Sequence, residues 1–221
     1  MNYVFHFGPI LDRWPEFLYG AARTMELTAA SALAGFIIGI FGALGRSFGS
    51  APLRAAIGAY VEIIRNTPLL VQLYFVYFSL PLMGLRLSSD QSAILALSIH
   101  LGAYATEILR AGVEAVPAGQ IEAAKSLGLK RWQIIRHVIV VPAVRAVYPA
   151  LTSQFILQLL GTSIVSAIAA EELTAVANNM AMQTFRNFEI YIVIAVIYFV
   201  LVRLCDLGFR LVARLLFRWK T

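Results

Sequence analysis

The sequence has little charge for its length. Only 14% of its 221 residues are charged, whereas an ordinary soluble domain has about 25%. Hydrophobic residues make up 60% of the chain and the mean hydropathy is +0.77, so the composition indicates an integral membrane protein. The net charge of +6 does not indicate nucleic-acid binding, because the basic residues lie between and after apolar runs.

Several chemical motifs are also missing. Cys205 is the single cysteine, so no intrachain disulfide can form, and no Cys/His cluster has the spacing of a metal site. The first 20 residues contain Asp12, Pro15 and Glu16 and no basic stretch before an apolar core, so we expect no secretory signal. The loop G-x-x-x-x-G-K-[ST] is absent, so we expect the chain to have no ATPase site of this kind.

Five apolar stretches are candidates for membrane-spanning helices, which need about 20 mostly apolar residues. They cover residues 24–44, 68–83, 92–111, 143–169 and 191–211. The second is short unless residues 57–64 add turns to it. No repeat of 20–50 residues and no linker-like segment is present, so we expect one all-α membrane domain over residues 1–221, with about five spans.

The basic residues predict how these spans are oriented, because cytoplasmic loops carry an excess of Lys and Arg. With the N-terminus outside and the C-terminus inside, 14 basic residues lie on the cytoplasmic side and 4 on the outer side. The outer four are Arg13, Arg23, Arg86 and Arg186, and the cytoplasmic group ends with Arg214, Arg218 and Lys220. The sequence therefore predicts a multi-pass protein with its N-terminus out and its C-terminus in.

Glycines recur on one face of the first span. Gly35, Gly39 and Gly42 are spaced by four and three residues, which places them on the same side of a helix. Small faces allow helices to approach closely in lipid, so we expect this face to pack against another helix.

One polar, basic segment interrupts the apolar chain: EAAKSLGLKRWQIIRHVIVVP, Glu122 to Pro142. Pro117 and the helix formers after it predict a helix over 118–127, and Gly128 is a natural C-cap. A second, amphipathic helical stretch follows from Lys130. The charge pattern places this unit in the cytoplasm, where it either docks into a groove of another protein or lies on the bilayer.

The same segment resembles the EAA motif of ABC importer permeases. Further stretches are similar to the polar amino acid branch of that family, of the histidine/glutamine permease type: YVEIIRNTPLLVQLYFVYFSLP at 60–81, AYATEILRAGVEAVPAGQIEAAKSLGL at 103–129, TSIVSAIAAEEL at 162–173 and TFRNFEIY at 184–191. Together these matches cover most of the chain from the first span onward.

The resemblance implies a type I ABC importer permease fold in the bacterial inner membrane. Such permeases pair as homo- or heterodimers, receive solute from a periplasmic binding protein, and sit on two cytoplasmic ATPase subunits that bind ATP and Mg. It implies that residues 113–142 form the coupling segment, in which Glu122, Ala123, Ala124 and Gly128 contact the ATPase or make its turn. One departure is that the family's proline falls at Val141, whereas this chain has Pro142.

Polar residues inside the fourth span predict a solute pathway, because such residues are costly in lipid. Gln154, Gln158 and Gly161 or Thr162 share one helix face, and Gly161 before Thr162-Ser163 allows a break that frees backbone groups. Each residue could instead make a helix–helix hydrogen bond. His100 and Tyr104 of the third span are added as pathway candidates, although a packing role is the favoured interpretation of His100.

The family often carries carboxylates at the positions of Gln154 and Gly161, and this chain has none. A cationic solute side chain would find no anion there. Either the partner permease holds the main solute site, or the solute is a net-neutral zwitterion such as a polar amino acid, or another compact polar compound such as ectoine or an opine.

Glu107 and Arg110 are three residues apart and could form a structural ion pair. Two other function classes fit less well. An intramembrane hydrolase would need Ser163 within reach of His100 and an oxyanion site. A secondary transporter commonly has two halves that each carry a broken helix, and this chain has only one such segment.

Overall fold

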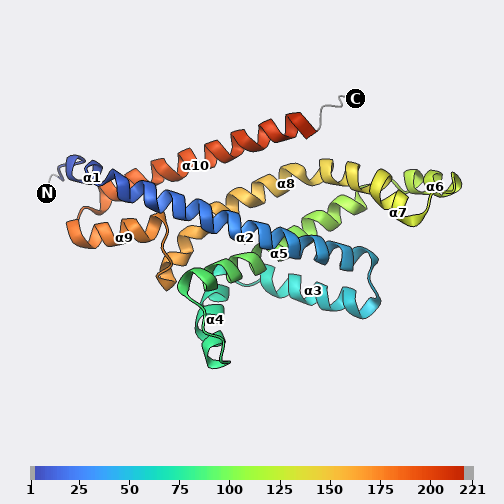
Figure 1. Cartoon of the computed structure of the whole chain (residues 1–221), viewed down its shortest axis with the longest axis horizontal. Coiled ribbons are helices and arrows are strands. Elements are labelled where there is room, and N and C mark those ends of the chain that lie inside the picture. The colour runs from blue at the N-terminus through green and yellow to red at the C-terminus, as the bar shows by residue number, and fades with distance from the viewer. Residues whose placement is uncertain (1–2, 217–221) are drawn as a thin grey trace. The chain divides into compact units, whose positions relative to one another are not determined.

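The computed structural model describes residues 3–216, and within this range it contains helices and no strands (Figure 1). The α-helices are α1 (Gly8–Leu11), α2 (Trp14–Phe48), α3 (Ala51–Arg65), α4 (Leu69–Leu82), α5 (Ser89–Glu114), α6 (Ala118–Ser126), α7 (Arg131–Gln133), α8 (Val140–Gly161), α9 (Leu173–Thr184) and α10 (Asn187–Leu216). A π-helix, Ile134–Ile139, joins α7 to α8, and a 3₁₀-helix, Thr162–Ile168, follows α8. Arg218 and Lys220 lie outside the described residues.

The all-α prediction is confirmed, with four to five apolar helices. Four helical stretches are long and apolar enough to cross a membrane: 14–48, 89–114, 131–168 and 187–216. The helix α4 is also apolar but has 14 residues, about 21 Å at 1.5 Å per residue, against roughly 30 Å of hydrocarbon. It is separate from α3, so residues 57–64 do not lengthen it. The N-out orientation stays a prediction.

The largest boundary difference is at the start of the first span, and one helix was not predicted. The helix α2 begins at Trp14, ten residues before the predicted start, because Pro15 and Glu16 are well suited to a first helical turn. Arg13 strengthens this start, since its Nε donates to Glu16 Oε1 at 2.6 Å. The helix α9 was not predicted. It is capped by Glu172, whose carboxylate accepts from the amides of Thr174 and Ala175 at 2.8 and 2.7 Å.

The described residues fall into two compact units, and α2, α5, α8 and α10 contribute residues to both. The first, unit 1, holds residues 3–32, 69–97 and 156–208. Its cores are apolar, with Leu27, Leu97 and Val165 in one cluster and Phe17 and Met180 in another. The prediction of a single domain over 1–221 stays a prediction.

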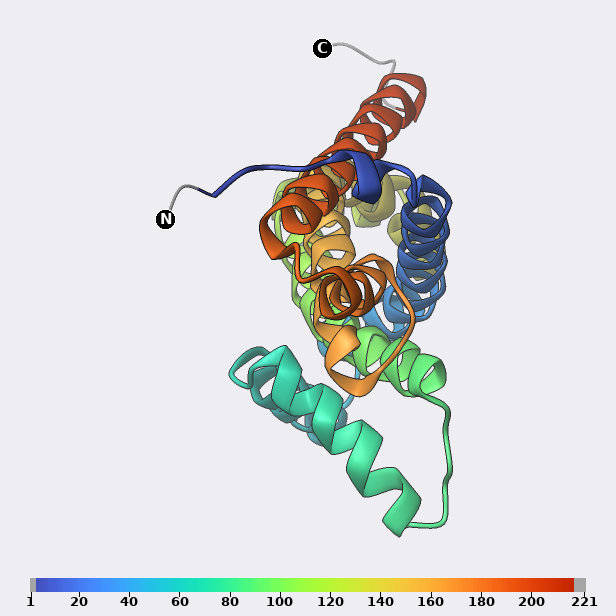
Figure 2. The same ribbon diagram turned by 90° about the vertical axis from the view of Figure 1, so that its left-hand side faces the viewer.

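The N-terminal segment of unit 1 is held by a buried carboxylate. It crosses the start of α10, as Figure 2 shows, where Glu189 accepts from the Tyr3 hydroxyl and from the His6 amide at 3.0 Å. Arg186 Nη1 also donates to Glu189, at 3.1 Å. Residues ahead of the first long helix are therefore part of the packed structure of this unit.

The second, unit 2, holds residues 33–68, 98–155 and 209–216. In it α2 and α5 pack along the predicted glycine face. A Cβ at Gly35 would lie 2.8 Å from Leu101 Cβ, and Gly39 and Gly42 face Ala105 and Thr106 still more closely. The packing interpretation of the glycine face is thus confirmed. Figure 1 shows α3 running back beside the second half of α2.

Candidate functional site

The helix α6 contains three of the four predicted coupling residues, Glu122, Ala123 and Ala124, and exposes two of them. Glu122 and Ala123 are exposed, whereas Ala124 is 5% exposed and packs in a cluster with Val116 and Ile134. Ala124 therefore fixes α6 to its own chain. Leu127, which the sequence reasoning missed, is 80% exposed at the end of this helix. The available signal was an apolar residue between Ser126 and Gly128, where the helix was predicted to end.

Gly128 ends α6 in the left-handed region, with φ 74°. Its amide donates to the Lys125 carbonyl at 2.9 Å, and the amide of Leu129 donates to the Ala124 carbonyl at 3.2 Å. These two bonds form a Schellman motif, which satisfies carbonyls left open at the helix end. A left-handed position costs other L-residues about 1–2 kcal/mol, so glycine suits it, although a Cβ would meet no atom within 4 Å.

Pro142 does not break the helix. Residues Arg131 to Gly161 run on without a gap through α7, the π-helix and α8. Proline lacks an amide and its ring crowds the carbonyl four residues earlier. The π-helix directly before it has a wider turn, in which the Val140 amide bonds the Ile135 carbonyl five residues back.

The two glutamines of the predicted pathway face on α8 differ in their hydrogen bonding. Gln158 is 3% exposed, and its Nε2 donates to Ser31 Oγ at 3.0 Å and to the Leu97 carbonyl at 3.1 Å. It links three helices of unit 1 as a packing residue. Gln154, one turn earlier in unit 2, is 9% exposed and has no hydrogen-bond partner among residues 3–216.

The helix changes type where the sequence predicts a break. α8 ends at Gly161 and the 3₁₀-helix begins at Thr162. The hydroxyls of Thr162 and Ser163 donate to carbonyls three residues back, each at 2.7 Å. Both hydroxyl protons are therefore bound within the helix itself. Gly161 has an ordinary φ of −65°, so the change does not depend on glycine's conformational freedom.

The remaining pathway candidates lie on α5 in unit 2. The rings of His100 and Tyr104 have centroids 5.0 Å apart, and the Arg65 guanidinium lies over the Tyr104 ring at 5.3 Å. Ser163 belongs to unit 1 and His100 to unit 2. Because the Ser163 hydroxyl is spent on the Leu160 carbonyl, nothing in its geometry indicates a nucleophile activated by a base.

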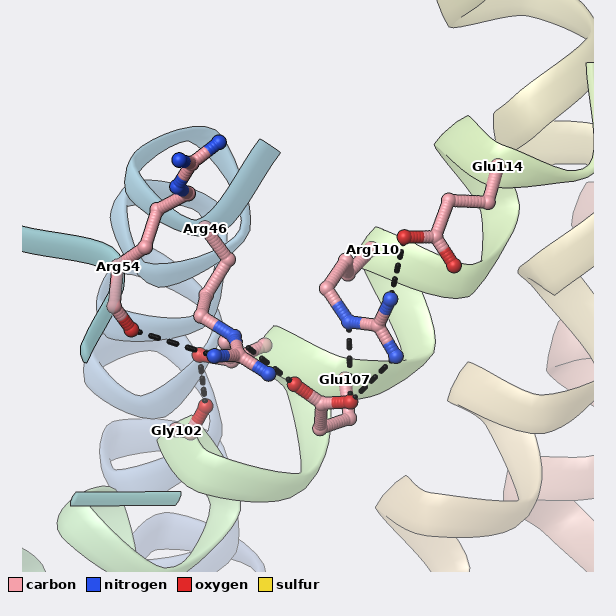
Figure 3. Close-up of polar contacts among 7 residues, drawn as sticks. Arg46, Arg54, Gly102, Glu107, Arg110 and Glu114 are labelled. Carbon is pink, nitrogen blue, oxygen red and sulfur yellow. Dashed lines mark hydrogen bonds and ion pairs between the residues drawn. The ribbon is translucent and has the colours of Figure 1, made fainter. Parts of the chain in front are cut away.

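A chain of alternating charges runs along the C-terminal half of α5 (Figure 3). Arg110 donates from Nε and Nη2 to Glu107 Oε2 at 3.0 and 2.8 Å, and its Nη1 contacts Glu114. Arg46 of α2 lies on the other side of Glu107, with Nε 3.6 Å from Oε1, and its Nη1 donates to the Arg54 carbonyl at 3.2 Å. The predicted Glu107–Arg110 pair is therefore one part of a network that joins α2, α3 and α5.

No group of three or more His, Cys, Asp or Glu side chains suited to a metal ion occurs among the residues that the structure describes.

Comparisons with known proteins all point to membrane transport. The family described as binding-protein-dependent transport system inner membrane component matches residues 35–218. The glutamine transport system permease protein GlnP of Escherichia coli (strain K12) is 33% identical over 199 residues, 89% of this chain and 91% of GlnP. The L-cystine transport system permease protein TcyB of Bacillus subtilis (strain 168) is 35% identical over 207 residues, 93% of this chain and 88% of TcyB. The crystal structure of an amino acid ABC transporter with histidines contains a chain 37% identical to this one, with a TM-score of 0.89 over 96% of this chain and 99% of that chain.

Proposed function

The chain belongs to the family of binding-protein-dependent transport system inner membrane components and has the fold of type I ABC importer permeases, and from this premise we propose its specific role. It is the permease subunit of an ATP-driven importer that moves a polar amino acid or a similar small zwitterion from periplasm to cytoplasm. The protein lies in the bacterial inner membrane with its N-terminus outside. A second permease subunit, two ATPase subunits that bind ATP and Mg, and a periplasmic binding protein complete the transporter.

The observation that carries this proposal is the exposed helix α6 with its left-handed turn. Glu122, Ala123 and Leu127 face away from their own chain, while Ala124 and the Gly128 turn hold the helix against it. A short helix held from behind and open in front suits docking into a groove of an ATPase. Force on α6 would pass into α8, because the Ala124 cluster includes Ile139 and Ala143.

The proposed solute class is supported by the named solutes of the relatives and by the lack of carboxylates on α8. GlnP and TcyB are named as permeases for glutamine and L-cystine, both amino acids with no net charge at neutral pH. In this chain the matched carboxylate positions are Gln154 and Gly161, so α8 offers no anion to a cationic solute. A net-neutral amino acid fits this half best. The same residues favour one alternative, in which the partner permease holds the main site for an opine or ectoine-like solute.

The direct test is whether substitutions in α6 and its turn uncouple amino acid uptake from ATP hydrolysis. The assembled transporter is reconstituted in proteoliposomes with its binding protein, and amino acid uptake and ATP hydrolysis are measured together. Gly128→Val forces a β-branched residue into the left-handed region, and Glu122→Lys reverses the exposed charge, so we expect both to lose uptake by about tenfold or more while the permease still inserts.

The matched control is Gly128→Asn, since asparagine tolerates the left-handed region. It should retain most of the uptake that Gly128→Val loses. Normal uptake in both Gly128→Val and Glu122→Lys would show that α6 is not the coupling element.

A further inference from the structure

Unit 2 contains a polar cavity that the coupling segment and the predicted pathway face on α8 do not account for. Its volume is about 470 Å³, within the roughly 300–1,000 Å³ typical of small-molecule sites. Residues of α2, α3 and α5, together with Asn66 directly after α3, line it: Arg46, Gly58, Val61, Glu62, Arg65, Asn66, Tyr104 and Glu107. Gly58 keeps the wall open, because a Cβ there would lie 2.6 Å from Arg46 Nη1.

The charges in this cavity are incompletely paired. Among the described residues, neither Glu62 nor Arg65 forms an ion pair, and Arg65 is held only by stacking over Tyr104. Deeper in the wall, Arg46 Nε and Glu107 Oε1 are buried and face each other as an ion pair at 3.6 Å, which is too long for a hydrogen bond, and neither atom has a hydrogen-bond partner within residues 3–216. Because this ion pair lacks a hydrogen bond, a ligand or water at the wall could complete the contacts of both atoms.

The lining selects for a ligand with both signs of charge. Two guanidinium groups and two carboxylates face one space, which gives the cavity no net charge. A phosphate or another strong anion would meet Glu62 and Glu107, and a simple cation would meet Arg46 and Arg65. A zwitterion satisfies both sets, because guanidinium binds carboxylate in a two-pronged geometry while a carboxylate accepts from an ammonium group.

We propose that this cavity binds the backbone charges of a free amino acid, with the α-carboxylate at Arg65 and the α-ammonium at Glu62. The proposal rests on the proposed import function and adds a second solute site, separate from the predicted pathway face on α8. Val61 is the one aliphatic side chain in the lining, so the site offers little apolar surface for reading the solute's side chain. By the predicted orientation it lies towards the cytoplasm, where solute leaves the permease.

Equilibrium binding to the assembled transporter tests this site. The complex is placed in nanodiscs without binding protein or nucleotide, and binding of radiolabelled L-glutamine is measured. We expect Arg65→Gln and Glu62→Gln each to weaken binding by about tenfold or more, since each removes one charge-assisted contact. Arg65→Lys should restore part of the loss. Arg54→Gln, on the exposed part of the same helix, should leave binding within about twofold.

Competition with capped analogues identifies which residue reads which charge. L-glutamine amide lacks the α-carboxylate and N-acetyl-L-glutamine lacks the α-ammonium, so both should compete poorly for the wild-type site. In Arg65→Gln, glutamine and its amide should compete equally. In Glu62→Gln, glutamine and its N-acetyl form should compete equally.

The proposal is overturned if wild-type nanodiscs bind no glutamine, or if both charge-neutralising variants bind it as the wild type does. Loss of binding that tracks with loss of folded protein in size-exclusion profiles would also overturn it. ATP-driven uptake of amino acids, measured in parallel with the binding protein present, separates the two hypotheses. Uptake without cavity binding removes this site alone, whereas failure to import any amino acid removes the proposed function.

Discussion

The two units differ in how completely they satisfy their buried polar groups. In unit 1, Gln158, Glu172 and Glu189 are each buried and each make two or more hydrogen bonds. Four buried side-chain atoms among the described residues lack a hydrogen bond, and three of them belong to unit 2. These are Arg46 Nε, Ser47 Oγ and Glu107 Oε1.

This difference distinguishes polar groups that stabilise the fold from polar groups that can still bind a solute. A polar group that is fully bonded within its own chain stabilises packing and has nothing left for a solute. The fourth unbonded atom is Arg23 Nε in unit 1, and the terminal nitrogens of that guanidinium contact Glu26 and Asp90. Arg46 Nε and Glu107 Oε1 of unit 2 contact each other as an ion pair at 3.6 Å, without a hydrogen bond. Hydrogen bonds thus hold the buried carboxylates and Gln158 of unit 1 in place, whereas Arg46 and Glu107 of unit 2 lie in the wall of the proposed solute cavity with fewer hydrogen bonds.

The largest expected effect is in unit 1, at the cap of α9. Glu172 accepts from the amides of Thr174 and Ala175 and from the Tyr198 hydroxyl, at 2.8, 2.7 and 2.7 Å. Glu172→Ala leaves these three donors without their acceptor, so we expect it to lower the free energy of unfolding by about 2–4 kcal/mol. Equilibrium unfolding of the purified permease in mixed micelles measures this change.

Glu171→Ala is the matched control for that substitution. The wild-type Glu171 carboxylate is exposed and accepts from the Tyr19 hydroxyl at 2.7 Å. Exposed contacts of this kind contribute little, so the change should stay within about 0.5 kcal/mol. Equal losses in the two variants would mean that the bonds of Glu172 are not what holds α9.

The second prediction compares two glutamines one turn apart on α8. Gln158→Leu removes hydrogen bonds to Ser31 and Leu97 and should cost about 1–2 kcal/mol in the same unfolding assay. Gln154→Leu removes an amide that has no partner among the described residues, so its effect on stability should be near zero. Uptake should show the reverse order, since Gln154 is the amide left available for solute. A larger stability loss in Gln154→Leu would contradict the contrast between the units.

Two local features, α6 and the glycine face of α2, could be predicted from the sequence because their signals are local. Pro117 and Gly128 bracket α6 in the sequence, and the helix lies between them. The spacing of Gly35, Gly39 and Gly42 likewise predicted a close-packed face on α2. Its partner on α5 was not predictable, because the fit between facing helices depends on tertiary structure.

The unpredicted part of the candidate site lies in contacts between distant segments. Gln154 and Gln158 carry the same sequence signal, yet their different roles depend on Ser31 and Leu97, which are 127 and 61 residues from Gln158. The polar cavity of unit 2 also arises from contacts between segments that are distant in the sequence. From the sequence alone, Glu62 and Arg65 are ordinary charges on a short helix, and only the tertiary structure shows that residues of α2 and α5 line an open cavity with them.

The smallest expected effect is a pH dependence at Glu172, which lies outside the spanning helices. Burial raises the pKa of this carboxyl from its ordinary 4.5, and its hydrogen bonds offset part of the rise. A raised pKa in the folded state means that the folded protein binds the proton more tightly, so its stabilising effect is fully present below about pH 4.5. It is lost as the pH rises through the folded-state pKa. The stability of the wild type relative to Glu172→Gln should therefore fall with increasing pH in the micelle assay. A wild type that gains on Glu172→Gln as the pH rises would show that the three donors outweigh burial.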